Sequence, residues 1–322
     1  MNYLLDNYLD ESSLEQKAIR EGFGEGIVHA ADLNDQIVVL NADLPGSLKL
    51  QKFSEKYPKN YFQVGVAEQN MAGIGTGLAH YGKIPFITSF AAFSPGLNFS
   101  QIRLAALGHQ NLKVVGSHYG LNVGPDGSSA QMNADIGMMK SLAGMTIVSP
   151  ADYHQAIQAT IELSKLEGPA YLRVTRAKLP VFIKHGSDFE IGKAQVLEEG
   201  DDLTIIASGS IVYEALHAAE LVKKEKGITI DFINLHTIKP LDTETIFASA
   251  KKTGKVVVIE EHNVWGGVGE SITRFLGEVQ PTPVKCIGLQ DTFGESGEHK
   301  ELWEKYGLSR DKLVEQISEF IG

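Results

Sequence analysis

Short runs of β-branched and other apolar residues alternate with amphipathic stretches from about residue 15 to the end of the chain. Short apolar runs bounded by Gly, Pro or Asn are typical of strands that are buried in parallel sheets. One amphipathic stretch, residues 149–168, predicts a helix with Ser149 or Asp152 as alternative N-caps and Gly168 after its end. In this first part of the chain we predict strands within residues 36–44, 84–90, 111–118, 145–150 and 169–175.

The pattern breaks at residues 177–200, where mixed charges and turn residues show no sustained period, and we interpret this segment as a linker with short strands. The alternation then restarts. It predicts strands at 203–209, 228–235, 255–261 and 283–289, with helices near 211–225, 241–252, 267–277 and 310–321. Alternating strands and helices favour parallel sheets covered by helices. The expected fold class is α/β, as two consecutive open α/β domains with mainly parallel sheets, at residues 1–185 and 186–322.

The bulk composition suits a soluble globular protein. The chain has 322 residues, of which 43% are hydrophobic, enough for about two domains. Its net charge of −11 argues against nucleic-acid and anionic-membrane partners, because neither attracts an acidic surface. The single cysteine, Cys286, permits no intrachain disulfide. The N-terminal stretch lacks a secretory signal pattern, and no apolar run reaches the ~18 residues of a membrane span. We expect a cytoplasmic protein.

Common catalytic and phosphate-binding motifs are missing. The sequence contains no G-x-x-x-x-G-K-[ST] loop and no G-x-S-x-G nucleophile motif. The segment "GGVGES" at 266–271 could hold an anion on backbone N–H groups, although a tight strand-to-helix connection is the commoner use. The segment "EEHNVW" at 260–265 has two acids and His262 but no second metal ligand at a fixed spacing. We expect no metal site built by this chain.

One carboxylate, Glu68, stands in the apolar segment "YFQVGVAEQNMAGIGTGLAHYG" at 61–82, which we interpret as a buried helix. Gly73, Gly75 and Gly77 each cost a helix ~1 kcal/mol relative to alanine, which suggests that another backbone or a cofactor packs closely there. A buried carboxylate needs a partner or a function. The alternative is a Glu in the first helical turn, stabilised by the helix dipole and partly solvated. The pattern by itself leaves both interpretations open.

Several motifs resemble those of the transketolase family, in the same order and at similar spacing. The segments "VGVAEQNMAGIGTGLA", "PFITSFAAF" and "GLNVGPDGSS" resemble the family's pyrimidine-binding domain. The segments "GDDLTIIASGSIVYEALHAAELV" and "VVVIEEHNVWGGVGE" resemble its C-terminal domain. The resemblance runs from about residue 15 through nearly the whole chain. It implies an enzyme dependent on thiamine diphosphate that transfers a two-carbon ketol group from a ketose phosphate to an aldose phosphate.

The resemblance implies cofactor roles for four residues. Glu68 matches the glutamate that hydrogen-bonds the aminopyrimidine of thiamine diphosphate, where a carboxyl in an apolar pocket can share a proton with a ring nitrogen. It is the expected catalytic residue. Phe90 and Phe93 match aromatic residues that lie against the pyrimidine, although two such phenylalanines are more often simply core. Asp43 in "NADL" matches a position near the thiazolium.

The resemblance also implies a substrate site. Guanidinium groups bind an anion in bidentate fashion, while an imidazole and a hydroxyl donate single hydrogen bonds. Asp126 in "GPDG" matches a position near the substrate hydroxyls, although this is also an ordinary turn sequence. The residues that match those holding the terminal phosphate are Arg20, Ser47, His118 and Arg176.

The turn at Asp126 departs from the family pattern. Transketolases usually read G-x-D-G-[PA]-T-H there, whereas this chain reads "GPDGSSAQ", so that Ala130 replaces a histidine that contacts substrate hydroxyls. Loss of a group that binds a hydroxyl can change substrate discrimination greatly. We therefore expect an unusual anionic ketose, such as a branched or sulfonated sugar.

A second departure concerns the cofactor's diphosphate. Thiamine diphosphate requires a divalent metal, Mg²⁺ or Ca²⁺, held by a G-D-G…N motif, and no "GDG" occurs in this sequence. The resemblance therefore implies the C-terminal subunit of a split transketolase, whose N-terminal partner subunit carries the diphosphate and metal site. We expect the catalytic centre to lie between subunits of an α2β2 assembly, and this chain alone to be inactive.

Other functions remain open from the sequence. The β subunit of a 2-oxoacid dehydrogenase E1 component has the same two-domain plan, but a small 2-oxoacid does not need the anion-binding residues. A 1-deoxyxylulose-phosphate synthase-like activity is a variant of the same class that normally keeps both halves on one chain. A non-catalytic transketolase-like partner protein is favoured only by Ala130, while the presence of Glu68 argues against it.

Overall fold

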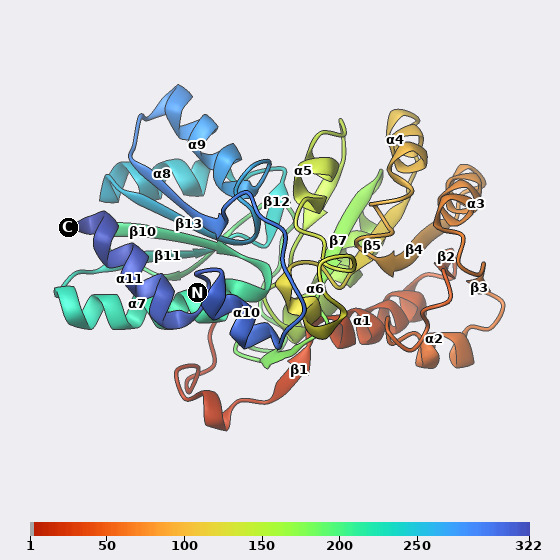
Figure 1. The fold of residues 1–322 in the computed structure, drawn as a ribbon. Helices are drawn as coiled ribbons and strands as arrows, with labels where there is room; N and C mark the ends of the chain where they lie inside the picture. The colour runs from red at the N-terminus through yellow and green to blue at the C-terminus, as the bar shows by residue number, and fades with distance from the viewer. Residues whose placement is uncertain (1–2) are drawn as a thin grey trace.

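Two mainly parallel sheets lie side by side and form the frame of the chain (Figure 1). The computed structural model describes residues 3–322, so residues 1–2 of the predicted first domain lie outside it. Within that range the larger sheet has seven strands, in the order β12 (Thr237–Lys239), β6 (Thr146–Val148), β7 (Ala170–Val174), β5 (Lys113–Ser117), β4 (Ile84–Phe90), β2 (Ile37–Asn41) and β3 (Tyr61–Gln63). The smaller sheet has five, in the order β14 (Val284–Leu289), β13 (Val256–Asn263), β10 (Leu203–Ser208), β11 (Ile230–Asn234) and β9 (Gln195–Glu198). A separate antiparallel pair joins β1 (Gln16–Ala18) to β8 (Lys178–Pro180).

Helices cover both faces of each sheet (Figure 1). The larger sheet carries α1 (Ile19–Leu33), α2 (Gln51–Lys56) and α6 (Tyr153–Lys165) on one face and α3 (Glu68–His80), α4 (Phe99–Leu107) and α5 (Asp135–Lys140) on the other. The smaller sheet carries α7 (Val212–Lys226) and α11 (Arg310–Ile321) on one face and α8 (Thr243–Thr253) and α9 (Val268–Val279) on the other. The connections contain α10 (His299–Lys305) and the 3-10 turns η1 (Glu11–Ser13), η2 (Leu121–Asp126) and η3 (Gly209–Ile211). No helix within residues 3–322 is long and apolar enough to cross a membrane.

The predicted fold class is confirmed, and the predicted strands form the central part of the larger sheet and, with β14 at the edge, four of the five strands of the smaller one. β2, β4, β5, β6 and β7 pair in parallel in the larger sheet, and β10 pairs in parallel with β11 and β13 in the smaller one. The strands are buried on both faces, which explains why they appear in the sequence as continuous apolar runs. The linker predicted at 177–200 contains two short strands, β8 and β9.

One strand from the second half of the chain completes the sheet of the first half. β12 pairs antiparallel with β6, with Thr237 opposite Val148. Its three residues are too few for a recognisable alternation, so the sequence did not predict it. The two halves also share one apolar core, which includes Ile19 of α1, Leu203 of β10 and Trp303 of α10. The second half is therefore in direct contact with the elements that carry the predicted site.

The segment 61–82 is not a single helix, and that prediction is wrong at its start. Its first residues form β3 at the edge of the larger sheet, Gly65 turns the chain at φ 72°, and α3 begins only at Glu68. Short apolar runs do not distinguish strand from helix by periodicity. Because the segment begins with a strand and a turn, Glu68 lies shortly after the carboxyl end of β3.

Asp152, rather than Ser149, caps α6. Its Oδ1 accepts a hydrogen bond from Gln155 N at 2.9 Å, which satisfies one of the free N–H groups of the first helical turn. Its Oδ2 accepts from Phe182 N at 3.0 Å and Ile183 N at 2.8 Å. The carboxylate therefore fixes both the start of α6 and the chain that leaves the larger sheet.

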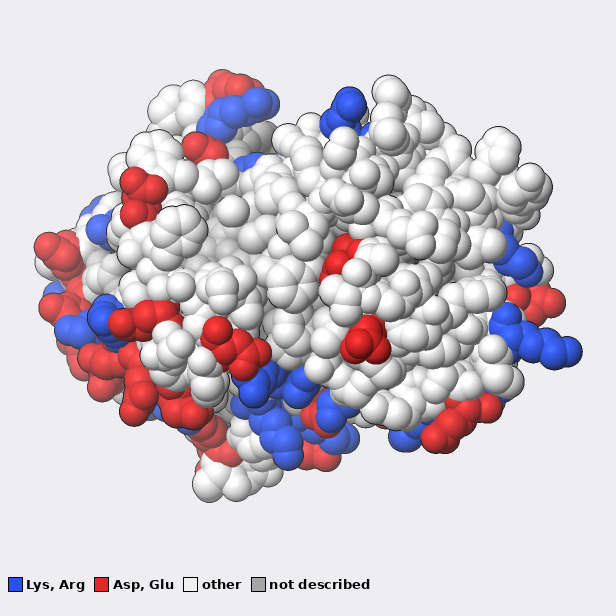
Figure 2. All heavy atoms as spheres, turned by 45° about the vertical axis from the view of Figure 1, so that its right-hand side comes forward, with Lys and Arg blue, Asp and Glu red and all other residues white. Residues whose placement is uncertain are grey.

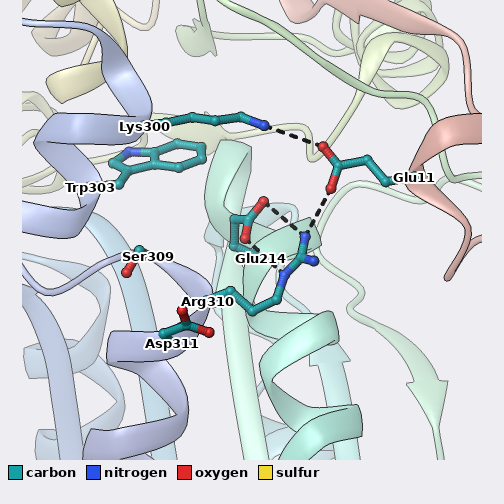
Figure 3. Close-up of a pocket in the computed structure, with 7 residues that line it drawn as sticks. All are labelled: Glu11, Glu214, Lys300, Trp303, Ser309, Arg310 and Asp311. Atoms are coloured by element: carbon teal, nitrogen blue, oxygen red, sulfur yellow. Dashed lines mark hydrogen bonds and ion pairs between the residues drawn. The ribbon is translucent and has the colours of Figure 1, made fainter.

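The N-terminal residues of the described chain pack against its second half. The Tyr213 hydroxyl donates to Tyr8 O at 3.1 Å. Glu11 in η1 pairs with Lys300 of α10 at 3.3 Å and with Arg310 of α11 at 3.1 Å (Figure 3). These contacts tie the segment that leads into α1 to the C-terminal helices.

Candidate active site

Most of the predicted site residues follow the carboxyl ends of parallel strands in the larger sheet. These ends meet at one edge, which is where open α/β sheets bind ligands. The residues are Asp43 and Ser47 after β2, Glu68 after β3, Phe90 and Phe93 at the end of β4, His118 and Asp126 after β5, and Arg176 after β7. Arg20, near the start of α1, joins the same edge because its N–H donates to Thr175 O at 3.3 Å.

Glu68 is the first residue of α3 and is only 6% exposed. Ser89 Oγ donates to its Oε1 at 3.1 Å, and Asn98 Nδ2 donates to its backbone oxygen at 3.1 Å. These bonds hold the carboxylate against the end of β4. Glu68 lies in the first helical turn, as one interpretation expected, but it is buried there rather than partly solvated.

The glycines of α3 divide between a packed face and an open face. A Cβ at Gly75 would lie 2.7 Å from Ile87 Cγ2 and 2.9 Å from Leu112 Cδ1, so this close approach requires glycine. A Cβ at Gly73 or Gly77 would meet no atom of the described chain within 4 Å. The predicted close packing is therefore present at Gly75, against side chains, while the other two glycines lie on a face that the described residues leave uncovered.

Phe90 and Phe93 form a stacked pair beside Glu68. Their ring centroids are 6.0 Å apart with an interplanar angle of 12°. Phe90 also stacks on His118, with centroids 3.7 Å apart. Ser89, which bonds the Glu68 carboxylate, directly precedes Phe90. A series of neighbouring residues thus leads from Glu68 through Ser89 and Phe90 to His118.

Arg20 meets His118 at the end of this series of residues. Arg20 Nη1 donates to Ser47 O at 2.9 Å and lies 3.3 Å from His118 Nε2. Ser117 Oγ lies 2.7 Å from the other ring nitrogen, Nδ1. Burial, followed by the charges of Arg20 and Arg176, lowers the pKa of His118 to about 3. The imidazole is therefore neutral at physiological pH.

Arg176 is the second cationic group. Its Nη1 donates to Val123 O at 2.7 Å and to Asp126 Oδ1 at 3.1 Å. Burial, followed by the charge of Arg176, lowers the pKa of Arg20. This effect is expected where two guanidinium groups lie near the same space. Because it pairs with Arg176, Asp126 belongs to the charged part of the site.

Arg20 and Arg176 border a cavity of about 340 Å³, which we call the tail pocket, whereas His118, Ser47 and Asp126 are not among the residues that line it. Its walls come from both halves of the chain, because α10 packs against η2. Two arginines and a lysine suit an anionic ligand. The polar and charged residues that line the tail pocket are Arg20, Asn122, Arg176, Lys178, Glu298 and His299.

Four of these residues, Asn122, Lys178, Glu298 and His299, were not predicted from the sequence. Asn122 stands close to the predicted turn at Asp126, which was the available signal, but asparagine is common in turns for local reasons. His299 belongs to α10, in the second half of the chain. No spacing in the sequence connects α10 with the edge of the larger sheet, so only the packing of the two halves reveals it.

Asp43 lies apart from the other predicted residues. It is exposed, has a φ of 60°, and its N–H donates to Gln63 Oε1 at 2.7 Å. Within residues 3–322 no hydrogen bond or ion pair connects its side chain with Glu68 or the tail pocket. Its role near the thiazolium stays a prediction.

The segments "GGVGES" and "EEHNVW" serve structural contacts. Glu260 accepts hydrogen bonds from Val268 N at 2.7 Å and Gly269 N at 2.9 Å, so the backbone groups that could hold an anion are already bound. The strand-to-helix connection is therefore the better interpretation of the glycine-rich turn. Glu261 accepts from Asn122 N at 2.7 Å, a contact with η2 behind the tail pocket.

Comparison with known proteins bears out the sequence resemblance. Residues 15–181 match the model of the transketolase pyrimidine binding domain, and residues 192–313 match that of the transketolase C-terminal domain. The chain belongs to the transketolase family. Relatives of similar length are named transketolase sections or subunits, which favours this activity over that of a 2-oxoacid dehydrogenase β subunit.

Several similar proteins are separate transketolase subunits of about the same length as this chain. A 6-deoxy-6-sulfo-D-fructose transketolase subunit from Clostridium sp. (strain MSTE9) is 38% identical over 96% of each chain. One of the subunits of an apulose-4-phosphate transketolase, from Phocaeicola vulgatus, is 34% identical over 94% of this chain and 97% of its own. The solved structure of a split gene transketolase, an inactive β4 tetramer, has a TM-score of 0.88 and 37% identity, covering 94% of this chain and 98% of that one. The prediction of the C-terminal subunit of a split, two-chain transketolase is thereby confirmed.

Proposed function

We propose that this chain, together with an N-terminal partner subunit, transfers a two-carbon ketol group from an unusual anionic ketose to an aldose phosphate. One series of contacts carries the proposal. Ser89 bonds the buried Glu68 carboxylate, and the next residue, Phe90, stacks on His118. His118 in turn lies 3.3 Å from Arg20, which lines the cationic tail pocket. A cofactor-activating acid at one end and an anion-binding pocket at the other suit a substrate whose reacting carbon and charged tail lie at opposite ends.

The residues around Glu68 fit thiamine diphosphate. A buried carboxylate beside a stacked aromatic pair suits a flat heterocycle that offers a ring nitrogen. When bound, thiamine diphosphate would supply the carbanion chemistry of ketol transfer. Glu68 would hydrogen-bond the ring nitrogen, Phe90 and Phe93 would lie against the ring, and Asp43 would stand near the thiazolium.

The face of α3 and α4 is suited to a partner subunit. Ile74, Leu104 and Leu107 are 39%, 55% and 72% exposed there, beside the uncovered Gly73 and Gly77. Figure 2 shows a broad surface with few charged side chains on this side of the molecule. Exposed apolar surfaces of this kind mark interaction sites. The related β4 tetramer is inactive, which supports a requirement for the N-terminal subunit. We propose an α2β2 assembly in the cytoplasm, in which the partner holds the diphosphate with Mg²⁺ or Ca²⁺.

The substrate proposed here is an anionic ketose other than the ordinary ketose phosphates. Ala130, in the turn after η2, is buried and offers a methyl group where the family has an imidazole. Two relatives of similar length are named for 6-deoxy-6-sulfo-D-fructose and apulose-4-phosphate, which both carry an anionic group. A retained tail pocket combined with an altered hydroxyl contact fits a sugar of this kind.

In this proposal the chain's own residues bind and orient the substrate. Arg20 and Arg176 would pair with the charged tail. Because the pKa of His118 is about 3, the imidazole would contribute shape and hydrogen bonding rather than charge. Stacking on Phe90 and the contact with Ser117 would keep its ring in place.

The catalytic assignment is tested with Glu68→Gln in the chain reconstituted with its partner subunit. Turnover should fall by about 10²–10⁴, because the amide cannot share a proton with the cofactor ring in the same way. Glu55→Gln, on an exposed position of α2, is the matched control and should keep full turnover. Full activity of the Glu68 variant would contradict the assignment and favour a non-catalytic partner protein.

The reaction and the partner are tested with the wild-type chain. The reconstituted enzyme should transfer a ketol group and should not oxidatively decarboxylate a 2-oxoacid, and the chain alone should show no turnover. Sulfonated and branched ketoses should give a higher kcat/KM than xylulose 5-phosphate. A clear preference for xylulose 5-phosphate would contradict the unusual substrate, and turnover without a partner would contradict the split site.

A further inference from the structure

The tail pocket is bordered by buried nitrogen atoms that lack hydrogen-bond partners. Arg20 Nε, Asn122 Nδ2 and His299 Nε2 have none among the described residues, and all three residues line this one cavity. An unsatisfied buried polar group costs about 1–3 kcal/mol, so its presence in a folded protein calls for an explanation. A ligand that brings acceptor oxygens into the pocket would remove this cost.

The hydrogen bonds of Asn122 determine which end of its side-chain amide is the oxygen and which is the nitrogen. Its backbone N–H donates to Glu261 Oε1 at 2.7 Å, and its Oδ1 accepts from Ala177 N at 2.8 Å. Because a backbone N–H can only donate, the oxygen of the amide is the end that faces Ala177. Nδ2, with two hydrogens to donate, is therefore the end without a partner in a side chain only 2% exposed.

Glu261 fixes this arrangement from the second half of the chain. Its side chain is 1% exposed, and its second oxygen accepts from Ser210 Oγ at 2.6 Å. The carboxylate also fills the space beside Gly120, where a Cβ would lie 2.5 Å from Oε1. Gly120 has a φ of 71°, a conformation that other residues rarely adopt. The turn that presents Asn122 is thus built around this one buried carboxylate.

We propose that Asn122 Nδ2 is an additional hydrogen-bond donor to the oxyanion at the charged end of the substrate, and that Glu261 is its positioning residue. This inference rests on the proposed function, because it concerns the same pocket. The ligand group is a phosphate or a sulfonate, whose oxygens both accept hydrogen bonds from a neutral amide. The second half of the chain thereby contributes to substrate affinity as well as to the fold.

The test uses Asn122→Asp in the chain reconstituted with its partner subunit. The substitution keeps Oδ1 as acceptor for Ala177 N and replaces the donor Nδ2 with a negatively charged oxygen of similar size. KM for a ketose phosphate, a sulfonated ketose or both should rise at least about tenfold, while kcat/KM for a ketol donor without a charged tail stays unchanged. Asn34→Asp is the matched control, because its Oδ1 also accepts a backbone N–H, from Gln36 at 3.0 Å, before the amino end of β2.

A second variant, Asn122→Ala, removes the donor without adding charge and should raise the same KM by a smaller factor. A rise for only one of the two oxyanions supports the proposal and identifies the group that the pocket takes. Unchanged KM values in both variants, or equal losses on tailed and tail-less donors, would overturn the proposal. Absence of ketol transfer in the wild-type reconstituted enzyme would instead refute the proposed function.

Discussion

Two cavities share the helix α10, and their charged residues are used differently. The second cavity, about 270 Å³ in volume, is lined by residues that include Glu11, Glu214, Lys300 and Arg310, and we call it the Glu11 pocket (Figure 3). There Arg310 pairs with Glu11 at 3.1 Å and with Glu214 at 3.2 Å, and Lys300 pairs with Glu11 at 3.3 Å. Each of these charges is compensated by another side chain of the same pocket.

In the tail pocket this compensation is incomplete. Arg20 donates to the neutral Ser47 O and has no carboxylate partner among the described residues, and its Nε has no partner at all within them. Only Arg176 has an acid, Asp126, and that pair is partly exposed. The comparison separates two uses of charge. Mutually paired groups tie segments of the fold together, while unsatisfied donors are available to a ligand.

The largest effect is expected when an arginine of each pocket is replaced, Arg20 in the tail pocket and Arg310 in the Glu11 pocket. Arg20→Met should raise KM for an anionic ketose by about a hundredfold in the reconstituted enzyme, because a charge-assisted bidentate contact is lost. Arg310→Met removes an arginine from the Glu11 pocket and should leave KM unchanged while lowering the melting temperature. The measurements are steady-state kinetics and thermal unfolding of both variants. Equal KM values in the two variants would remove the distinction between the pockets.

A smaller effect is expected at the neighbouring buried acids Glu260 and Glu261, which are each 1% exposed. Glu261→Gln should raise KM for an anionic ketose about tenfold with little change in kcat, because Asn122 loses its charged acceptor. Glu260→Gln, which alters the contact with the start of α9, should reduce thermal stability and leave KM unchanged. Loss of stability without any KM change in both variants would show that Glu261 has only a structural role.

The smallest effect concerns Glu11 and depends on pH. Burial opposes its ionisation, but hydrogen bonds and charges from Arg310 and Lys300 outweigh burial and lower its pKa. An acid with a lowered native pKa stabilises the fold above its unfolded pKa, and this contribution disappears as pH falls through the native value. Glu11→Gln should therefore cost less than about 1 kcal/mol near pH 7, because the pair is partly exposed, and less at pH 3 than at pH 7. Urea unfolding at both pH values measures the difference, and a cost that grows at low pH would contradict the sign.

Much of the larger sheet and of its ligand-binding edge could be predicted from the sequence. The apolar runs that became β4, β5 and β7 are nearly continuous, and each is followed by a residue of the predicted site, such as His118 after β5. Parallel strands bring such residues to one edge, so a correct strand prediction places them together. The three-residue strands β3 and β12 could not be predicted in this way, because neither has the continuous apolar run that indicated the equally short β6.

The sequence by itself determined the fold class and the family and identified Glu68 as the candidate acid, because these depend on local patterns and on motifs that are continuous along the chain. Only the tertiary structure decided that α10 of the second half reaches the tail pocket, that Glu261 accepts a hydrogen bond from Asn122 behind that pocket, and that Asn122 is held there with a free donor. The physical reason is that these contacts join residues far apart in the sequence. Their hydrogen bonds exist only after both sheets have packed against each other.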